Sequence, residues 1–463
     1  MVIGAGMAGM AAAIRLALFD RKVLLLERHN VPGGLNSYYA QAGRRFDVGL
    51  HAVTNYAPPR ARGAPLNKIF RQLRIGREEF ALSEQKGSRI VFPGFDLSFA
   101  NDLESFRAEI ESVFPQCIDG FDRLLAIMDD FDSLSSHPPD LSARQVLRET
   151  LAEPALEDAL MCPLCYYGSA RENDMEFAQF VIMFNALFRE GFGRPLEGVR
   201  RVIRVLRNKY RSLGGERRLK TGVKRIVARD GKATSLELDD GQVIEATHVV
   251  STIGWVETQR LCSDREQDAG KEEIGRLSFV ETITVTDLQP ADLGWEDTIV
   301  FFNTEESFVY ERPEDLVDLR SGVICFPNNY LYPDGENLDE GFFRVTALAD
   351  FNGWASLDES IYKEEKAKWF ERLHKVSMQV LPETDEARLN RHVIATDMFT
   401  PRTIQHFTGK LGGAVYGAPD KRRDGATHLS NLHLCGTDQG FLGIVGAMLS
   451  GISIVNQRIL SPS

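Results

Sequence analysis

The sequence of 463 residues predicts an α/β fold in which a parallel sheet is interrupted by a second, α+β part. Three observations support this prediction. A glycine-rich loop at residues 4–9 lies between a short apolar stretch and a run of small residues typical of a helix. A second apolar stretch at residues 21–27 ends in an acid. Strand-forming sequence returns after residue 219, beyond a long helical stretch, so the sheet is expected to be assembled from separate parts of the chain.

The glycine-rich loop has the spacing GxGxxG. Gly4 permits the tight turn, Gly6 lets the backbone approach a pyrophosphate, and Gly9 lets the helix pack closely on the strand. Met7 and Ala8 begin the helix, whose free N–H groups and positive end favour phosphate. Only three residues precede Gly4, so the first strand is expected to be short or to begin upstream of the given start.

The second apolar stretch ends at Glu27, 18 residues after Gly9, where a carboxylate can bind ribose hydroxyl groups. Together these features predict a Rossmann-type dinucleotide-binding unit, which either NAD or FAD could occupy. Arg28, Gly33-Gly34 and Phe46-Asp47-Val48-Gly49 follow in an order that resembles the two-dinucleotide-binding-domain flavoproteins. That resemblance favours FAD. No second GxGxxG occurs, so a separate nicotinamide domain is not indicated.

The formal net charge of -12, from 54 basic and 66 acidic residues, argues against nucleic acid as a partner. Six scattered cysteines do not form a disulfide framework, and the single CxxC at Cys162 and Cys165 is interpreted as structural. No metal site is indicated. No charge-free apolar stretch reaches the ~18–20 residues needed to span a bilayer. We therefore expect a cytoplasmic protein, with membrane association left open and the oligomeric state undetermined.

The middle of the chain mixes helices and strands. A hairpin is expected within residues 80–100, and residues 102–209 read as mainly helical, with breaks at Pro115, Pro138-Pro139 and Pro163. The dense apolar block at residues 177–188 has three interpretations: a buried helix, a wall of a long apolar substrate channel, or a surface that dips into lipid. Residues 280–350 are strand-rich, and residues 360–379 read as an exposed helix of mixed charge.

This pattern divides the chain into two interleaved domains. The FAD-binding domain is expected to comprise residues 1–59, 210–262 and 425–463. The substrate-binding or membrane-facing domain is expected to comprise residues 60–209 and 263–424, with the helical stretch 102–209 as an insert.

Basic residues are unevenly distributed. One cluster comprises Arg60, Arg62, Lys68, Arg71, Arg74 and Arg77. The other holds eight basic residues between Arg189 and Arg211. Such segments can bind anionic lipid headgroups, or they can simply form a solvated outer face.

Four segments in order give a more specific resemblance: residues 4–34, residues 215–254, the stretch from Thr400-Pro401-Arg402-Thr403 to Gly412-Gly413-Ala414-Val415-Tyr416-Gly417, and residues 433–451. They resemble the bacterial-type phytoene desaturase family with its carotenoid isomerase and retinol saturase relatives. The resemblance implies an amine-oxidase-like flavoprotein that uses FAD. It also implies desaturation, saturation or isomerisation of carbon–carbon bonds in a carotenoid-like or other long isoprenoid, with hydride exchanged at flavin N5.

The resemblance also assigns site residues. Residues that would contact FAD are Gly4, Gly6, Met7, Ala8, Gly9, Glu27, Arg28, Gly33, Gly34, Leu35, Val223, Gly436, Asp438, Gly443 and Gly446, with Gly451 a further small residue on the same helix. Val223 would meet the adenine through its backbone, and Asp438 would accept hydrogen bonds from ribityl hydroxyls. His51 is the candidate for proton transfer, and Thr400, Arg402 and Tyr416 are expected to line the site.

Two departures from the family pattern affect the flavin-facing surface. Residues 440–446 read GFLGIVG where the family often has PGxG[VI]PG, and Leu35 stands where an Arg is frequent. Two alternatives therefore remain open: an amine-oxidase-like enzyme with another substrate, and a flavinless lipid-binding protein like Rab escort proteins. Intact Gly4, Gly6, Gly9 and Glu27 argue against the second alternative.

Overall fold

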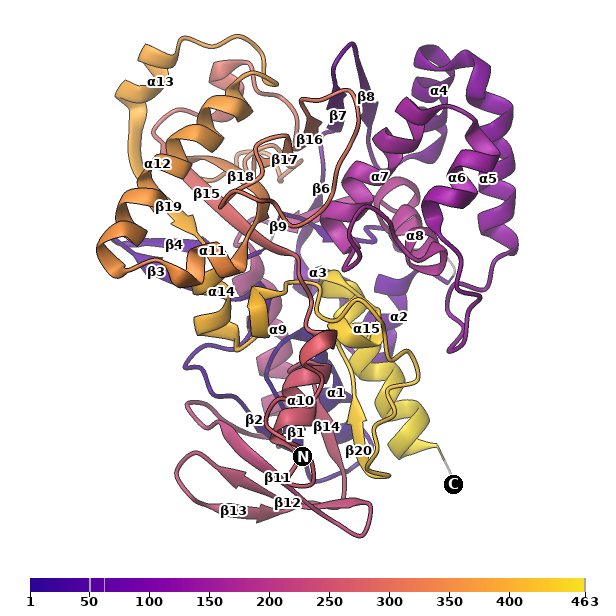
Figure 1. The fold of residues 1–463 in the computed structure, drawn as a ribbon, viewed down its shortest axis with the longest axis vertical. Helices are drawn as coiled ribbons and strands as arrows, with labels where there is room; N and C mark the ends of the chain where they lie inside the picture. The colour runs from indigo at the N-terminus through magenta and orange to yellow at the C-terminus, as the bar shows by residue number, and fades with distance from the viewer. Residues whose placement is uncertain (50, 62, 462–463) are drawn as a thin grey trace.

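The computed structural model describes residues 1–49, 51–61 and 63–461. The chain builds two large sheets that lie in separate halves of the molecule, and both termini lie in the lower half in the view of Figure 1. Arg62 of the first basic cluster falls outside the described residues.

The lower half contains a five-stranded sheet in which every pairing is parallel. Its strand order is β10 (Glu216–Arg218), β2 (Leu24–Leu26), β1 (Val2–Ile3), β14 (Val249–Ser251) and β20 (Leu432–Leu434). Three distant parts of the chain therefore complete one sheet, which confirms the predicted α/β fold. The first strand in the chain, β1, comprises Val2 and Ile3.

The alternation of side chains along these strands separates two cores. Val2, Leu25 and Val250 face four helices: α1 (Met7–Ala17), α2 (Pro65–Leu73), α9 (Val199–Ser212) and α15 (Gly443–Val455). Ile3 and Val249 face the other way, toward an antiparallel meander of β11 (Val223–Arg229), β12 (Lys232–Leu238) and β13 (Val243–Glu245). Such alternation is the period-2 pattern of a strand buried on both faces.

The upper half contains a mixed seven-stranded sheet, in which only β7 and β16 pair in parallel. Its order is β19 (Val393–Phe399), β15 (Ser278–Thr286), β18 (Gly341–Ala349), β17 (Ser321–Cys325), β16 (Ile299–Asn303), β7 (Ser88–Phe92) and β8 (Phe95–Phe99). The hairpin of β7 and β8 lies within residues 80–100, as predicted.

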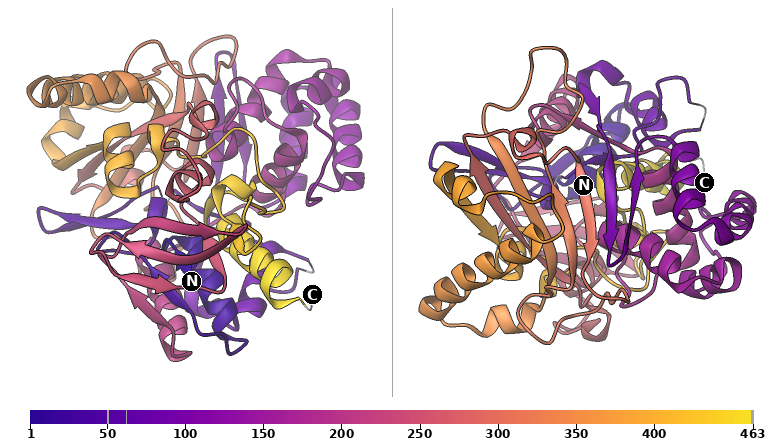
Figure 2. Two further views of the ribbon diagram at one scale, coloured as in Figure 1. Left: turned by 60° about the horizontal axis from the view of Figure 1, so that its bottom comes forward. Right: turned by 90° about the horizontal axis from the view of Figure 1, so that it is seen from above.

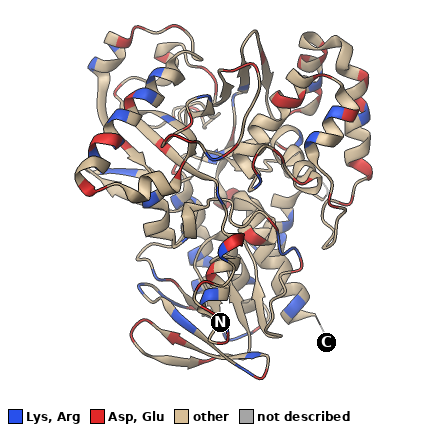
Figure 3. Cartoon of the chain, viewed as in Figure 1, with Lys and Arg blue, Asp and Glu red and all other residues tan. Residues whose placement is uncertain are grey.

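Helices cover both faces of this sheet (Figure 2). One face packs against α4 (Leu103–Val113), α5 (Ile118–Asp130), α6 (Ala143–Leu151), α7 (Pro154–Gly168) and α8 (Phe177–Phe184). The other packs against α12 (Glu359–Met378), which is mostly exposed and carries both charges (Figure 3). The predicted break at Pro163 is wrong: α7 continues through this proline, because neighbouring segments bury the helix almost completely and compensate for one lost backbone hydrogen bond.

The apolar block forms α8 and a following π-helical turn at Asn185–Arg189. Phe177, Phe180, Phe184 and Phe188 are each less than 2% exposed. The block is therefore a buried helix, and the lipid-dipping interpretation is wrong, because its phenylalanines pack against one another and against Phe106 and Phe121.

The remaining strands and helices are short. The strands are β3 (Tyr38–Gln41), β4 (Arg44–Asp47), β5 (Val53–Thr54), β6 (Leu82–Glu84) and β9 (Phe192–Pro195). The helices are α3 (Arg77–Phe80), α10 (Trp255–Leu261), α11 (Phe351–Ser356), α13 (Glu386–His392) and α14 (Pro401–Thr408).

One helical stretch of the described residues, Gly443–Leu460, is long and apolar enough to cross a membrane by length and composition alone. Val445, Met448 and Ile454 of this stretch are fully buried in the core beneath α1. The packing is that of a core helix in a globular protein. All six cysteines are buried and free, including Cys162 and Cys165 of the CxxC.

Candidate functional site

A large cavity lies between the two sheets and reaches from the glycine-rich loop to β15, β17 and β18. Its volume is about 1170 Å³. Sites for one drug-sized ligand are usually about 300–1,000 Å³, so this cavity is large enough for a dinucleotide.

The glycine-rich loop forms one end of the cavity. Gly4, Gly6, Met7 and Ala8 all line it, and α1 begins there without a side-chain cap. The first N–H groups of α1 are thus left for a ligand. A Cβ atom added to Gly6 would meet nothing within 4 Å, so this glycine faces open space. An uncapped helix N-terminus beside a bare backbone is a site for a pyrophosphate.

Gly9 has a different role from Gly6. A Cβ atom on Gly9 would lie 1.9 Å from the carbonyl oxygen of Gly4, so this glycine allows α1 to approach β1. Gly446 and Gly451 also lie outside the cavity lining, and a Cβ atom on Gly451 would lie 2.2 Å from the carbonyl oxygen of Ala8. Close packing of backbone accounts for glycine at both positions, and contact of Gly446 or Gly451 with the cofactor stays a prediction. Of the glycines on α15, Gly443 lines the cavity.

Glu27 lies at the end of β2, where its carboxylate is held by two backbone groups. The N–H of Ala5 donates to Oε2 at 2.8 Å and the N–H of His29 donates to Oε1 at 2.8 Å. Glu27 and Arg28 both line the cavity, and Arg28 donates to the carbonyl oxygen of His406 at 3.1 Å. The position suits recognition of a ribose.

Other predicted residues surround the same end of the cavity. Gly33, Gly34, Leu35, Val223 and Gly436 all line it. Gly33 and Gly34 have φ angles of 124° and 60°, a region that favours glycine. A Cβ atom on Gly34 would lie 3.4 Å from the Cα atom of Gly6, so the two glycine-rich segments meet here.

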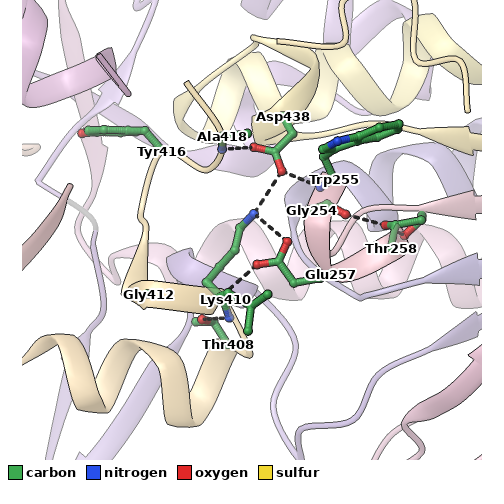
Figure 4. A network of polar contacts seen from close by, with 12 residues as sticks. Gly254, Trp255, Glu257, Thr258, Thr408, Lys410, Gly412, Tyr416, Ala418 and Asp438 are labelled. Carbon is green, nitrogen blue, oxygen red and sulfur yellow. Dashed lines mark hydrogen bonds and ion pairs between the residues drawn. The ribbon is translucent and has the colours of Figure 1, made fainter. Parts of the chain in front are cut away.

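Asp438 does not line the cavity, and its carboxylate belongs to a buried network (Figure 4). Oδ2 accepts from the N–H of Trp255 at 2.6 Å and from Lys410 Nζ at 3.4 Å, and Oδ1 accepts from the N–H of Ala418 at 2.8 Å. Burial disfavours the charged form of Asp438, but Lys410, Lys421 and the N–H groups of Trp255 and Ala418 together outweigh burial and lower the pKa of the carboxyl. In this structure the carboxylate of Asp438 accepts from three donors of the chain, and its contact with ribityl hydroxyls stays a prediction.

Lys410 and Glu257 complete this network from the cavity side. Both line the cavity, and their side chains lie 3.8 Å apart. The N–H of Leu411 donates to Glu257 Oε1 at 2.9 Å. The network therefore connects α10, the loop after α14 and the segment between β20 and α15 (Figure 4). Residues of all three segments line the cavity.

His51 lies in the same cavity among other polar side chains. Its Nε2 atom lies 3.3 Å from Glu281 Oε1 and 3.0 Å from Thr346 Oγ1. Arg344 Nε donates to the same oxygen of Glu281 at 2.6 Å. The nearby Tyr167 hydroxyl is buried and has no hydrogen-bond partner among the described residues.

Of the three residues expected to line the site with His51, only Tyr416 does so. Its hydroxyl donates to the carbonyl oxygen of Tyr166. Thr400 is fully buried and bonds to the Tyr362 hydroxyl at 2.8 Å, and Arg402 stacks over the Tyr362 ring at 4.3 Å. The predictions for Thr400 and Arg402 are wrong, because both residues anchor the start of α14 to α12. Thr403, one position further, lines the cavity.

Among the described residues, Cys262, Asp264 and His428 place potential metal-ligating atoms within 4.8 Å of one another. None of them lines the cavity, and His428 Nε2 already lies 3.2 Å from Asp264 Oδ1.

The model of the flavin containing amine oxidoreductase family matches residues 7–457, nearly the whole chain. The chain belongs to this family. It is similar to a prolycopene isomerase from Arabidopsis thaliana, with 24% identity over 90% of this chain and 73% of that protein. It is also similar to a neurosporene-forming phytoene desaturase from Rhodobacter capsulatus, with 28% identity over 58% of this chain and 55% of that protein.

A solved structure of an oxidoreductase from Methanosarcina mazei has the same fold. It superimposes with a TM-score of 0.68 at 15% identity and covers 98% of this chain and 99% of that one. The family-level resemblance expected from the sequence is thereby confirmed, and this flavin-containing oxidoreductase is an FAD enzyme.

The residues present fit FAD. The open position at Gly6, the uncapped start of α1 and the carboxylate of Glu27 provide for pyrophosphate and ribose, as described above. This fit, together with family membership, excludes the flavinless carrier considered from the sequence.

Glu281, Arg344 and Tyr167 are site residues that the sequence interpretation missed. A signal exists for two of them: Glu281 and Arg344 are charged residues within apolar strands, and both are buried. A charge inside such a strand needs a partner, and the partner is usually another buried charge. Tyr167 offers no comparable signal, because aromatic residues are common in core helices.

Proposed function

We propose that this FAD-dependent oxidoreductase acts on carbon–carbon bonds of a carotenoid-like or other long isoprenoid substrate. The names of its relatives, a prolycopene isomerase and a phytoene desaturase, support this substrate class. The reaction would be desaturation, saturation or isomerisation.

The observation that carries the proposal is the apolar wall of the cavity beyond the dinucleotide end. This wall is built by Ala52, Met183, Val323, Phe399, Ile404, Val415 and Leu442. Burial of apolar surface contributes roughly 25 cal/mol per Å², so a long hydrocarbon can bind here without hydrogen bonds.

FAD, when bound, would accept or donate the hydride. The chain's own residues bind the substrate, exclude water and handle the accompanying proton. His51 is the residue that would transfer the proton, because its imidazole can act as acid or base, it lines the cavity and its side chain is only 12% exposed.

The purified protein is expected to show the visible absorption of FAD and to change it anaerobically with a polyene. Phytoene, lycopene isomers and retinol should be compared. Bleaching by phytoene would select desaturation, whereas reaction of a cis-lycopene without net bleaching would select isomerisation. The His51→Gln protein should keep its flavin and lose roughly 10²–10⁴-fold in rate. A protein that reacts with none of these compounds, whether its flavin is oxidised or first reduced with dithionite, would contradict the substrate class.

A second candidate is an amine-oxidase-like reaction on another substrate. Four aromatic residues favour it: Tyr166, Tyr167, Phe279 and Tyr416 line the cavity together. Aromatic faces attract cations such as a protonated amine. Bleaching by primary or polyamines, with no response to polyenes, would select this candidate.

We propose further that the protein is cytoplasmic and binds reversibly to anionic membranes through α2. Lys68, Arg71 and Arg74 are exposed, and no carboxylate of the described residues forms an ion pair with them. The second basic cluster is partly neutralised by ion pairs. Arg189 pairs with Asp129 and Arg194 with Asp47. Arg201 and Arg204 both pair with Glu197.

Replacement of Lys68, Arg71 and Arg74 by glutamate is expected to weaken liposome binding about 100-fold, since each cation contributes about 1 kcal/mol at an anionic surface. Co-sedimentation with phosphatidylglycerol vesicles measures this. The matched control replaces Lys363, Lys368 and Lys375 of α12 by glutamate and should bind like the original protein. Equal losses in both variants, or binding that is indifferent to salt, would contradict the role of α2.

A further inference from the structure

The two ring nitrogens of His51 have different surroundings. Nε2 lies between Glu281 Oε1 at 3.3 Å and Thr346 Oγ1 at 3.0 Å. No hydrogen bond to Nδ1 exists among the described residues, while the side chain lines the cavity. One nitrogen is thus engaged by the protein, and the other is left for a ligand.

The register of two strands creates this arrangement. Glu281 of β15 lies directly opposite Thr346 of β18, so both side chains point to the same face of the sheet. Arg344 lies two residues before Thr346 and therefore shares that face. Its Nε donates to Glu281 Oε1 at 2.6 Å, and its guanidinium also donates to the carbonyl oxygen of Asp47 at 3.0 Å.

Glu281 is ionised at neutral pH. Burial disfavours its charged form, but Arg344 and His51 outweigh burial and lower the pKa to about 2. An ionised carboxylate can only accept hydrogen bonds. The proton of a neutral His51 ring consequently lies on Nε2, and Nδ1 carries the lone pair.

We propose that Glu281 is a positioning residue that fixes this tautomer of His51 and stabilises its protonated ring, so that Nδ1 is the proton-transfer atom of the site. The inference rests on the proposed function of His51. It resembles the carboxylate–histidine pairs of other enzymes in physical terms, since the carboxylate orients the ring and balances its charge.

Desaturation removes a hydride and a proton from two adjacent carbons of the substrate. One carbon of the substrate loses hydrogen with both bonding electrons, and the family's flavin is the oxidant. The adjacent carbon loses H⁺ to Nδ1, and the electron pair of that C–H bond becomes the second bond of C=C. Glu281 remains ionised throughout and faces the imidazolium. Saturation runs the same transfers in reverse.

Several other titratable groups surround His51. They are Tyr167 of α7, Cys325 of β17, Tyr330 of the following loop, Arg344 of β18 and the buried pair of Asp47 and Arg194. Burial raises the pKa of Tyr330 well above its usual value and that of Cys325 to about 12, so both stay neutral near pH 7. The carboxylate in contact with the His51 ring is that of Glu281.

The test uses flavin-loaded protein with ¹⁵N-labelled histidine and no substrate, with His51→Gln identifying the His51 signals. At alkaline pH the ring of the original protein should carry its proton on Nε2. In Glu281→Gln the proton of the neutral ring should no longer be confined to Nε2, because an amide can donate to that nitrogen as well as accept from it. Thr346→Val is the matched control, since it removes the other Nε2 partner and keeps the carboxylate, and its ring should keep the proton on Nε2.

Kinetics provide a second readout. The value of kcat/KM for the polyene that reacts should fall about 10-fold in Glu281→Gln, as expected for loss of an orienting carboxylate. Glu281→Asp should restore the original value in part.

The outcomes separate the two proposals. An unchanged tautomer in Glu281→Gln, or a proton on Nδ1 in the original protein, would overturn the role of Glu281. The second of these measurements needs no Glu281 variant, so it holds even if Glu281→Gln does not fold. A changed tautomer together with full activity of His51→Gln would instead overturn the proton-transfer role of His51 and leave the pairing intact.

Discussion

Replacing Gly6 by alanine is expected to leave the protein folded and to weaken FAD binding about 10- to 100-fold. The added Cβ would meet no atom of the chain within 4 Å, so the apoprotein can accommodate it. Alanine is a poorer helix N-cap than glycine, which lowers the free energy of unfolding by about 0.5–1 kcal/mol. It also restricts the unfolded chain, which raises the free energy of unfolding by a similar amount. The methyl group would occupy the space of the pyrophosphate, and overpacking there costs about 1–3 kcal/mol.

Flavin titration and chemical denaturation of apoprotein measure the two quantities separately. Gly9→Ala is the contrasting variant: its Cβ would lie 1.9 Å from the carbonyl oxygen of Gly4, so the free energy of unfolding of the apoprotein should itself fall by about 1–3 kcal/mol. Gly87→Ala is the neutral control, because its nearest contact would be 3.9 Å away and it does not line the cavity. Unchanged flavin affinity in Gly6→Ala would show that the pyrophosphate lies elsewhere.

Replacing Asp438 by alanine is expected to destabilise the protein by about 3–5 kcal/mol, because it leaves a buried cation poorly paired. Lys410 would keep only Glu257, at 3.8 Å, and the N–H groups of Trp255 and Ala418 would lose their acceptor. Lys410→Met combined with Asp438→Ala should recover part of the loss. Lys368→Met is the control, because its ion pair with Glu365 on α12 lies at the surface and contributes about 0–1 kcal/mol.

The same network sets an expected pH dependence. The pKa of Asp438 is lowered in the folded protein, so its stabilising contribution is complete above the unfolded value of about 3.9 and is lost as pH falls through the lower folded value. Asp438 and Glu257 outweigh burial and raise the pKa of Lys410, so its contribution is complete below about 10.4 and is lost at higher pH. Denaturation of Asp438→Ala should therefore differ most from the original protein between these limits. A constant difference down to about pH 1 would contradict this assignment.

Residues near one another in sequence were predicted well. Gly4, Gly6, Glu27 and Gly34 all line the cavity as expected, because backbone geometry at one βαβ unit is set by the glycines themselves. For residues such as Asp438 and Gly446, position within a motif does not settle where the residue faces. Neither lines the cavity of this structure, and Lys410, 28 residues from Asp438, donates to that carboxylate.

The sequence by itself determined the dinucleotide site, its cofactor class and the family, because these depend on local spacing of glycines and one acid. It also identified His51 as a candidate. Only the tertiary structure decided what His51 can do: Glu281 is 230 residues away in the chain, and the register between β15 and β18 places it opposite Thr346 and against the imidazole. Strand register depends on the packing of whole faces, which no short motif encodes, so the proton-handling part of the site became visible only once the two sheets were assembled.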